Sequence, residues 1–473
     1  MMKNFEQFGI EIPKILLPKN KDLKTWSVVA CDQYTQDENY WAKAALNVGD
    51  KESTLNLILP EVYLGRNDTS LRIQKIHKTM NDYLEKNIFD EEESEFIYLE
   101  RKTAYGRTRK GLVVAIDLDA YEWKPFNKAK IRATEATIVS RIPPRKEIRK
   151  GAALESPHIM LLVDDKNQKL VEETGSLVKK NPPVYDGDLM ENSGHIMGWA
   201  VKSQEAFDCV YNALSALKEK NSDSDGNSFM FAVGDGNHSL ATAKTVWEEY
   251  KAEQLKSGAT ESELANSRIR YALVEIVNIY DEGLTFEPIH RVVFNCDVQK
   301  LILRLAEKLN GKIVDFSCET ELENTVKNSK ADFGFVYSED GKFFYKGIQT
   351  QIKELAVSKF QPELDKFIDE ENSASLGESA GSSGTSSTSV SDSTSCKSSE
   401  NSCKQKIEID YIHGADEVFR LGKVDGNLAI MLPPVAKESF FETINSCGSL
   451  PRKSFSMGEA SEKRFYLECR KLF

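Results

Sequence analysis

The stretch FMFAVGDGNHSLATAKTVWEEY, residues 229–250, decides the fold class of this chain. Its first five residues are apolar and predict a buried strand, which ends in the glycine-containing turn 234–239. Beyond the turn, apolar residues recur at helical spacing: Leu240, Ala243, Val246, Trp247 and Tyr250. A strand that passes through a tight turn directly into a helix is typical of α/β proteins.

The turn itself concentrates polar groups that suit an anion. Its glycines allow the backbone to approach a ligand closely, and the start of the following helix offers unpaired N–H groups with partial positive charge. We assign Gly236, Asn237 and Ser239 to substrate or phosphate binding. Asp235 could hold Mg²⁺ or orient a hydroxyl, and His238 could exchange a proton with a transferred group, so both are catalytic candidates. The alternative is a plain turn capped by Asp235, since the third glycine of the dinucleotide fingerprint is missing.

A second candidate site lies in residues 131–149, where arginines cluster. Residues 131–139 predict a strand, and the two prolines at 143–144 end it and open a helix. Several guanidiniums near a strand end suit bidentate binding of phosphate or carboxylate. We therefore assign Arg132, Arg141 and Arg145 to the phosphate site. The alternative is a solvated basic face paired with the acidic surplus of the chain.

Two further positions are weaker candidates for substrate or phosphate binding. Asp32 follows a strand expected at 26–31, where polar side chains tend to line clefts, although a turn cap is an equal alternative. His290 and Arg291 stand together at the start of a strand expected at 291–294 and could bind an anion. A structural histidine is the alternative for His290.

Strand patterns and helix patterns also alternate along the rest of the chain, which predicts a mixed α/β fold. A capping box at 35–38 predicts the start of a helix. Further strands are expected at 95–100, 111–118, 158–163, 270–277, 407–412 and 427–432, and a last helix at 462–472.

The length and the net charge of the chain limit its number of packed units and its partners. The chain has 473 residues, enough for two or three packed units of about 150 residues each. Its 62 basic and 74 acidic residues give a net charge of −12, which argues against nucleic acid and anionic membranes as partners. A locally basic pocket for a small anionic metabolite is compatible with that charge, and so is a homodimer.

The cysteines and the first residues predict a cytoplasmic protein. None of the eight cysteines forms a CxxC pair or fits a zinc template. The first twenty residues lack the basic region and apolar core of a secretory signal, and no apolar run is long enough to span a bilayer.

One composition break divides the chain. Residues 372–404 are serine-rich with almost no large apolar side chain, so we expect a disordered insertion; a phosphorylated regulatory loop is the alternative. The expected parts are an N-terminal α/β region, a core that holds the GDGNHS turn, the insertion, and a C-terminal α/β region that packs on the core: 1–125, 126–371, 372–404 and 405–473.

The motifs resemble those of the family called domain of unknown function 1015, in a subgroup like that of Gram-positive bacteria. The resemblance is carried by SVVACDQYTQDENYW at 27–41, RATEATIVSRIPPR at 132–145, SPHIMLLVDD at 156–165, GDGNHSLATAK at 234–244, EPIHRVVF at 287–294 and LPRKSFSMGEASEKRFYLE at 450–468. It spans nearly the whole chain apart from the serine-rich tract.

A more distant resemblance concerns the turn. The usual turn of the family, Asp-Gly-His-His-Arg, is similar to the Asp-Gly-His-Thr-Arg turn of free-serine kinases in the ParB/sulfiredoxin-like superfamily. This implies a ParB/sulfiredoxin-like α/β core, a turn that binds nucleotide phosphates, and ATP or ADP as a cofactor. The chain departs from the family at Asn237 and Ser239, where the family has His and Arg. Glu135 corresponds to the glutamate of the family.

These observations favour a phosphoryl-transfer enzyme with a small hydroxylated or phosphorylated substrate, serine or phosphoserine first, in the kinase or the phosphatase direction. Phosphoryl transfer depends on positioning and charge stabilisation more than on a strong nucleophile. Glu135 or His238 would take the proton of the hydroxyl, and Asp235 would hold Mg²⁺. The alternative is a non-catalytic nucleotide or metabolite sensor.

Overall fold

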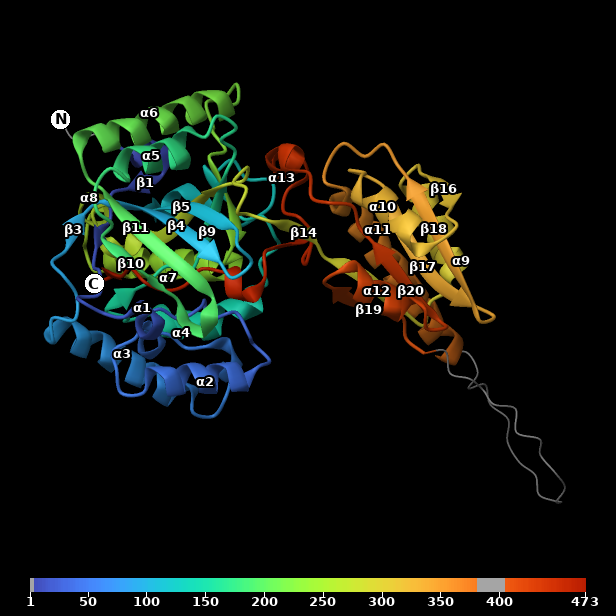
Figure 1. Ribbon diagram of the computed structural model, residues 1–473, viewed down its shortest axis with the longest axis horizontal. Coiled ribbons are helices and arrows are strands. Elements are labelled where there is room, and N and C mark those ends of the chain that lie inside the picture. The colour runs from blue at the N-terminus through green and yellow to red at the C-terminus, as the bar shows by residue number, and fades with distance from the viewer. Residues whose placement is uncertain (1–3, 381–404) are drawn as a thin grey trace, which may run out of the picture. The chain divides into compact units, whose positions relative to one another are not determined.

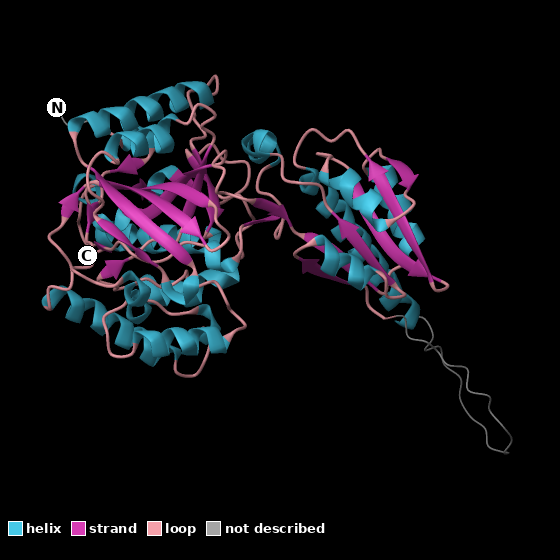
Figure 2. Cartoon of the chain, in the orientation of Figure 1, coloured by secondary structure: helices cyan, strands magenta, loops and turns pink. Residues whose placement is uncertain are grey.

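The computed structural model describes residues 4–380 and 405–473, which form two compact units (Figure 1). Unit 1 comprises the chain up to Thr285 together with Ile444–Leu450 and Met457–Phe473. Unit 2 comprises Phe286–Thr443 and Pro451–Ser456. The fold is mixed α/β, as the alternation of patterns predicts (Figure 2).

A large mixed sheet organises unit 1. Its strand order is β10 (Tyr185–Asp188), β11 (Gly194–Val201), β4 (Phe96–Thr103), β5 (Thr108–Asp117), β13 (Tyr271–Asn278), β9 (Met160–Val163), β12 (Phe231–Asp235), β7 (Ile131–Arg132) and β6 (Tyr121–Glu122), and β1 (Ile10–Glu11) pairs with β5. Every residue of β13 is buried, because the sheet is covered on both faces. The pairs β13–β9, β12–β7 and β6–β7 are parallel.

Helices on the two faces of this sheet enclose two hydrophobic cores. The helices of unit 1 are α1 (Leu23–Trp26), α2 (Glu38–Val48), α3 (Thr69–Glu85), α4 (Ile142–Arg149), α5 (Thr174–Val178), α6 (Gln204–Asn221), α7 (Asn237–Lys256) and α8 (Glu261–Ala265). One core contains side chains of α6 and α7, and the other contains side chains of α1, α2 and α3. Helices α5 and α6 accordingly lie on one side in Figure 1, and α1, α2 and α3 on the other.

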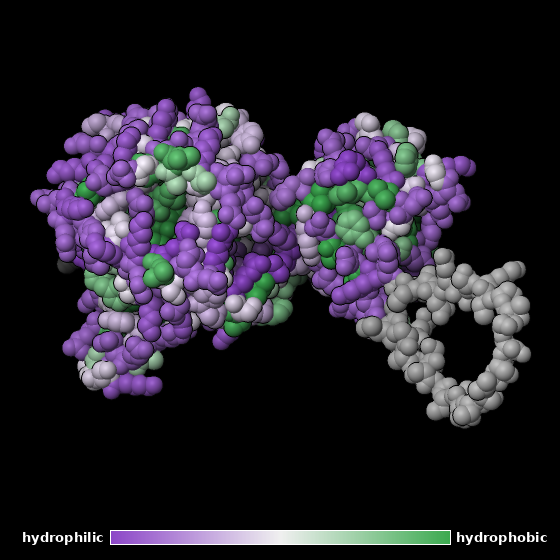
Figure 3. Space-filling model, turned by 90° about the horizontal axis from the view of Figure 1, so that it is seen from below, coloured by the Kyte–Doolittle hydropathy of each residue, from purple (hydrophilic) through white to green (hydrophobic). Residues whose placement is uncertain are grey.

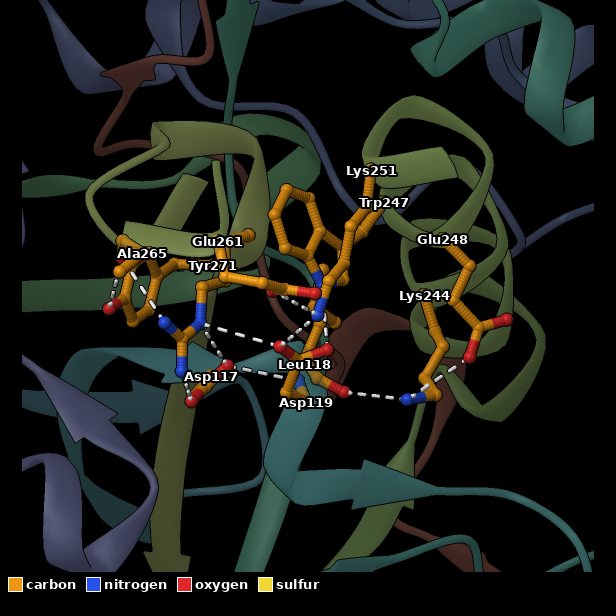
Figure 4. A network of polar contacts seen from close by, with 11 residues as sticks. Asp117, Leu118, Asp119, Lys244, Trp247, Glu248, Lys251, Glu261, Ala265 and Tyr271 are labelled. Carbon is orange, nitrogen blue, oxygen red and sulfur yellow. Dashed lines mark hydrogen bonds and ion pairs between the residues drawn. The ribbon is translucent and has the colours of Figure 1, made fainter. Parts of the chain in front are cut away.

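A polar network fixes α7 to the end of β5 (Figure 4). Trp247 Nε1 donates to Asp119 Oδ1 at 2.8 Å, and Lys244 Nζ donates to the carbonyl of Leu118 at 3.0 Å. Arg270 holds Asp117 through two hydrogen bonds of 2.9 and 2.6 Å. These bonds satisfy polar groups that the helix buries, and so they set its position on the sheet.

Unit 2 has its own sheet and core. The strand order is β16 (Lys312–Asp315), β18 (Lys342–Gln349), β17 (Phe333–Glu339), β20 (Asn427–Met431), β15 (His290–Phe294) and β19 (Glu408–Ile412). The helices that begin in unit 2 are α9 (Val298–Lys308), α10 (Glu319–Lys327), α11 (Ala356–Ala380), α12 (Ala415–Gly422) and α13 (Phe440–Cys447). The remaining short strands of the two units are β2 (Lys14–Ile15), β3 (Glu93–Ser94), β8 (Leu154–Glu155), β14 (Phe286–Pro288), β21 (Phe455–Met457) and β22 (Arg470–Lys471).

The division into units differs from the boundaries expected from composition. Residues on both sides of position 125 share one sheet, since β5 pairs with β13, and the break falls after Thr285. The region 405–473 is divided between the two units. Helix α11 continues to Ala380, inside the expected insertion; Asn372 anchors it by accepting from Ile407 N at 2.9 Å. Residues 381–404 of that insertion lie outside the described part of the chain.

Four local expectations are wrong. The strand expected at 131–139 covers only Ile131–Arg132. The strand expected at 26–31 is instead the end of α1 followed by an extended segment with a single β-bridge at Val29. Helix α2 is capped by Asp37, which accepts from Tyr40 N, and not by a box at Thr35. The helix expected at 462–472 is an extended segment, because its backbone pairs with distant residues such as Leu16 and Val28.

Within the described residues, no helix combines the length and the hydropathy that a membrane crossing requires. The face drawn in Figure 3 is mostly hydrophilic, with hydrophobic residues in scattered groups.

Candidate functional site

The turn after β12 leaves the start of α7 open. Gly236 has φ +85°, and a Cβ at this position would lie 2.9 Å from Ile159 Cγ1, so glycine is required here for two reasons. Helix α7 is 20 residues long, and its N-cap residue is Gly236, which has no side chain that could cap the first N–H groups. Its first N–H groups and the helix dipole therefore favour an anion at this end.

Lys463 stands beside this helix start. Its Nζ lies 3.3 Å from Asp235 Oδ2, and Asp235 Oδ1 accepts from Gly236 N at 2.9 Å. Buried arginines fix the segment that carries Lys463, since Arg109 Nη1 donates to the carbonyl of Glu462 at 2.6 Å and Arg101 Nη2 to that of Ser461 at 3.0 Å. An ammonium and an open helix N-terminus thus lie on either side of Asp235.

The loop after β7 packs against the same turn. Thr134 N donates to Asn237 Oδ1 at 3.1 Å, and Thr134 Oγ1 donates to the carbonyl of Val233 at 2.6 Å. Ile138 N donates to His238 Nε2 at 3.2 Å. The two stretches singled out from the sequence are therefore neighbours. Because Nε2 of His238 accepts a backbone hydrogen bond, the proton of the neutral ring lies on Nδ1.

A chain of hydrogen bonds starts at Ser239, in the first turn of α7. Ser239 Oγ lies 2.8 Å from His158 Nε2, and His158 Nδ1 lies 3.0 Å from the hydroxyl of Tyr466. That hydroxyl also accepts from Cys31 N at 3.3 Å. Burial, and then the neighbouring Cys31 and Asp32, raise the pKa of Tyr466 well above its ordinary value, so the phenol is neutral. Such a chain can hold His158 in one orientation toward Ser239.

Ser239 and His158 also line a cavity of about 150 Å³ in unit 1. Its other lining residues with polar or sulfur-containing side chains, apart from Met80, are Cys31, Glu61, Arg145, Arg149, Glu155, Ser156, Thr242, Tyr466 and Cys469. Burial raises the pKa of the Cys31 thiol well above its usual range, which keeps the thiol protonated. The cavity therefore presents hydroxyls, one imidazole and paired charges.

The predicted arginines do not surround the turn as a group. Arg132 is buried, stacks over Phe229 with its guanidinium carbon 4.3 Å from the ring centroid, and donates to Asn445 Oδ1 at 2.7 Å. Arg145 lines the cavity but is paired with Glu61, its Nη2 lying 2.5 Å from Oε1. Arg141 is exposed, and its carbonyl accepts from Arg145. These contacts give Arg132 a structural role, and its assignment to the phosphate site remains a prediction.

The remaining candidates are placed as follows. Glu135 is half-buried on the loop beside the turn, and its backbone bridges to Leu450. Asp32 accepts from Gln33 Nε2 at 3.0 Å, and its charge acts on Tyr466. The catalytic roles assigned to Asp235, His238 and Glu135 remain predictions.

His290 and Arg291 lie in unit 2 and are buried there. His290 Nδ1 accepts from Leu432 N at 3.1 Å, and Arg291 Nε donates to Gln361 Oε1 at 2.8 Å. Burial first, and then Arg291, lower the pKa of His290 to about 4. These contacts and the low pKa are those of a structural histidine, the alternative to anion binding at this position.

A metal site made by the protein alone is not formed in the described residues, where no three His, Cys, Asp or Glu side chains gather around one point. Mg²⁺ is commonly held by one or two carboxylates together with substrate phosphates. Asp235 fits that pattern as a single ligand.

Sequence reasoning missed three residues of the site: His158, Lys463 and Tyr466. Two of them, Lys463 and Tyr466, lie where a helix is expected from the pattern. The contacts of all three span long sequence separations, such as 308 residues between His158 and Tyr466. The motif SPH before β9 is the one local signal that could have indicated His158.

Comparison with known proteins identifies the family. The model of the family described as "Protein of unknown function (DUF1015)" matches residues 13–367. The chain belongs to this family. No curated protein matches the sequence.

The solved structures that match this chain have low sequence identity and low TM-scores. A conserved hypothetical protein from Pyrococcus furiosus is 13% identical at a TM-score of 0.32, covering 76% of this chain and 94% of that one. A mutant free serine kinase in complex with AMP is 12% identical at a TM-score of 0.36, covering 76% and 92%. SbnI with a C-terminal truncation, from Staphylococcus aureus, is 7% identical at a TM-score of 0.30, covering 73% and 83%.

Proposed function

We propose that this DUF1015 protein is a phosphoryl-transfer enzyme that acts on a small hydroxylated or phosphorylated metabolite, with serine and phosphoserine as the first candidates. The observation that carries the proposal is the open N-terminus of α7 with Lys463 Nζ 3.3 Å from Asp235 Oδ2. Backbone N–H groups, a helix dipole and an ammonium together stabilise phosphate charge.

The residues around this helix start could bind the nucleotide, hold Mg²⁺ and accept the proton of the substrate. Lys463 and the first amides of α7 would hold the phosphates of ATP or ADP, and Asp235 would hold a Mg²⁺ ion that the nucleotide carries. The substrate hydroxyl needs a proton acceptor within hydrogen-bond reach. His238 uses Nε2 for Ile138 N, so Glu135 is the first candidate of the two acceptors that the sequence predicts.

Titration calorimetry followed by a turnover assay tests the proposal. Wild-type protein is titrated with ATP, ADP, CTP and phosphoserine, with and without Mg²⁺, and transfer is then measured as nucleotide consumed and phosphate released. We expect Lys463→Met to weaken nucleotide binding by about tenfold or more. Asp235→Asn should bind nucleotide but lose turnover by about a hundredfold.

A second ion pair of the same chemistry supplies the controls. Lys128 Nζ and Asp223 Oδ2 are 2.9 Å apart on the surface, so Lys128→Met and Asp223→Asn should leave binding and turnover unchanged. Unchanged turnover in Asp235→Asn would exclude the catalytic assignment. Nucleotide binding without turnover of any substrate would favour the sensor instead, for which the pairing of Asp235 with Lys463 is the supporting observation.

A further inference from the structure

The cavity behind the first turn of α7 has room for a small organic molecule. Its volume is about 150 Å³, and much of its wall is apolar: Leu57, Leu59, Met80, Ile148 and Leu472 all line it. An apolar cavity of about this volume in another protein takes up benzene. The space therefore suits a body of about six carbon atoms.

Arg149, the last residue of α4, lines this cavity and has one edge of its guanidinium without a hydrogen-bond partner among the described residues. Its side chain is 17% exposed, and Nη1 lies 2.6 Å from Glu155 Oε2. Its Nε and Nη2 are buried and, across residues 4–380 and 405–473, have no hydrogen-bond partner. These two nitrogens share the other edge of the guanidinium, whose parallel N–H bonds match a carboxylate. A buried donor without an acceptor is unfavourable, so this edge favours the binding of an acceptor.

Each arginine that lines the cavity is paired with a carboxylate, but one of these carboxylates is shared. Arg145 is paired with Glu61. Glu155 is shared by Arg149 and by Arg470, whose Nε lies 2.5 Å from Oε1. Although burial acts against it, these two arginines lower the pKa of Glu155, which is therefore ionised. Because Glu155 serves two guanidiniums, Arg149 shares its carboxylate partner with Arg470.

We propose that the cavity binds a small monocarboxylic acid with an apolar body of about six carbon atoms. Its carboxylate is held by the Nε–Nη2 edge of Arg149 after a rotation of that side chain turns the edge toward the cavity. This inference goes beyond phosphoryl transfer and does not rest on it. The cavity is lined by Ser239 of α7, while the anion site proposed above is formed by Asp235 and Lys463.

Titration calorimetry on the full chain, without nucleotide, tests this site with benzoate and 4-methylpentanoate as probes. Benzamide is the uncharged control of the same shape, and we expect it to bind about tenfold or more weakly than benzoate. Arg149→Met should lose benzoate binding by a similar factor. Arg304→Met is the matched control, since Arg304 in unit 2 also pairs one carboxylate, Glu370, and also has a buried Nε.

Two further variants separate binding from folding. Arg149→Lys keeps the positive charge but removes the two-pronged edge, and Ile148→Trp fills the cavity from half-exposed Ile148 while leaving Arg149 in place. Both should weaken benzoate while circular dichroism stays that of the wild type. Equal binding of benzoate and benzamide, full binding by Arg149→Met, or no heat from either carboxylate would overturn the proposal. Nucleotide titrations of the same samples report separately on the phosphoryl-transfer site.

Discussion

Burial makes His290 a pH-sensitive residue of unit 2. Its pKa is lowered from 6.5 to about 4, mainly by desolvation, so the folded state holds the neutral ring while the unfolded state binds a proton below pH 6.5. Stability is therefore complete above pH 6.5 and is lost as the pH falls toward 4. The difference of about 2.5 pKa units corresponds to about 3 kcal/mol in the free energy of unfolding.

Denaturant unfolding of the wild type and of His290→Asn from pH 7 to pH 4 measures this effect. Asparagine can still accept from Leu432 N, so the variant should fold and should show a shallower pH dependence than the wild type. His195→Asn is the control, because His195 is more exposed and lies between Asp186 and Asp188 at 2.7 and 2.8 Å. Equal pH profiles for wild type and His290→Asn would contradict this expectation.

At the level of elements, the junction of β12 and α7 depends on Gly236. A Cβ there would meet Ile159 Cγ1 at 2.9 Å, and the φ of +85° at this position would hold alanine in the left-handed region, which costs about 1–2 kcal/mol. Gly258 has a similar φ of +96° with open space around it. We expect Gly236→Ala to lower the free energy of unfolding more than Gly258→Ala, and to weaken nucleotide binding, which Gly258→Ala should preserve. Calorimetric titration and chemical denaturation of the two variants provide the comparison, and equal effects would show that the contact with Ile159 is unimportant.

The same junction shows which elements can be predicted from sequence. The pattern of residues 229–250 predicts the strand, the turn and the helix that the structure shows, because the pattern is local and the apolar stripe of α7 packs on the sheet. Residues 131–139 contain β-branched side chains, yet the strand ends at Arg132. Thr134 bonds instead to Val233 and Asn237, about 100 residues away. Tertiary hydrogen bonds overrode the local preference here.

Part of the candidate site can also be predicted from the sequence. The sequence indicated the turn and the stretch beside it, and the structure brings these two together through Thr134 and Ile138. The sequence could not indicate that Arg132 stacks on Phe229, or that Lys463, near the end of the chain, contacts Asp235. Such contacts depend on which segments the sheet brings together, and charge patterns in one stretch do not encode that.

For the whole molecule, two units with separate sheets and cores imply two unfolding events. Unit 1 contains a buried ion cluster in which Glu275, with no exposed surface, lies 3.2 Å from Arg109 Nε and 2.9 Å from Arg464 Nη1. Although burial opposes it, these arginines lower the pKa of Glu275. The carboxylate is therefore charged in the folded protein. Removal of one charge from such a cluster typically costs about 3–5 kcal/mol, because the remaining buried charges lose their compensation.

Differential scanning calorimetry of the full chain should therefore resolve two transitions that respond to different variants. Glu275→Gln should lower the midpoint of one transition, and a shift from pH 7 to pH 5 should lower the other through His290, an effect that His290→Asn should reduce. Glu323→Gln is the control for a lost carboxylate, since its partner Lys327 is mostly exposed and surface pairs contribute about 0–1 kcal/mol. A single transition that moves as a whole both in Glu275→Gln and on the shift to pH 5 would show that the two units unfold as one cooperative body, in spite of their separate sheets.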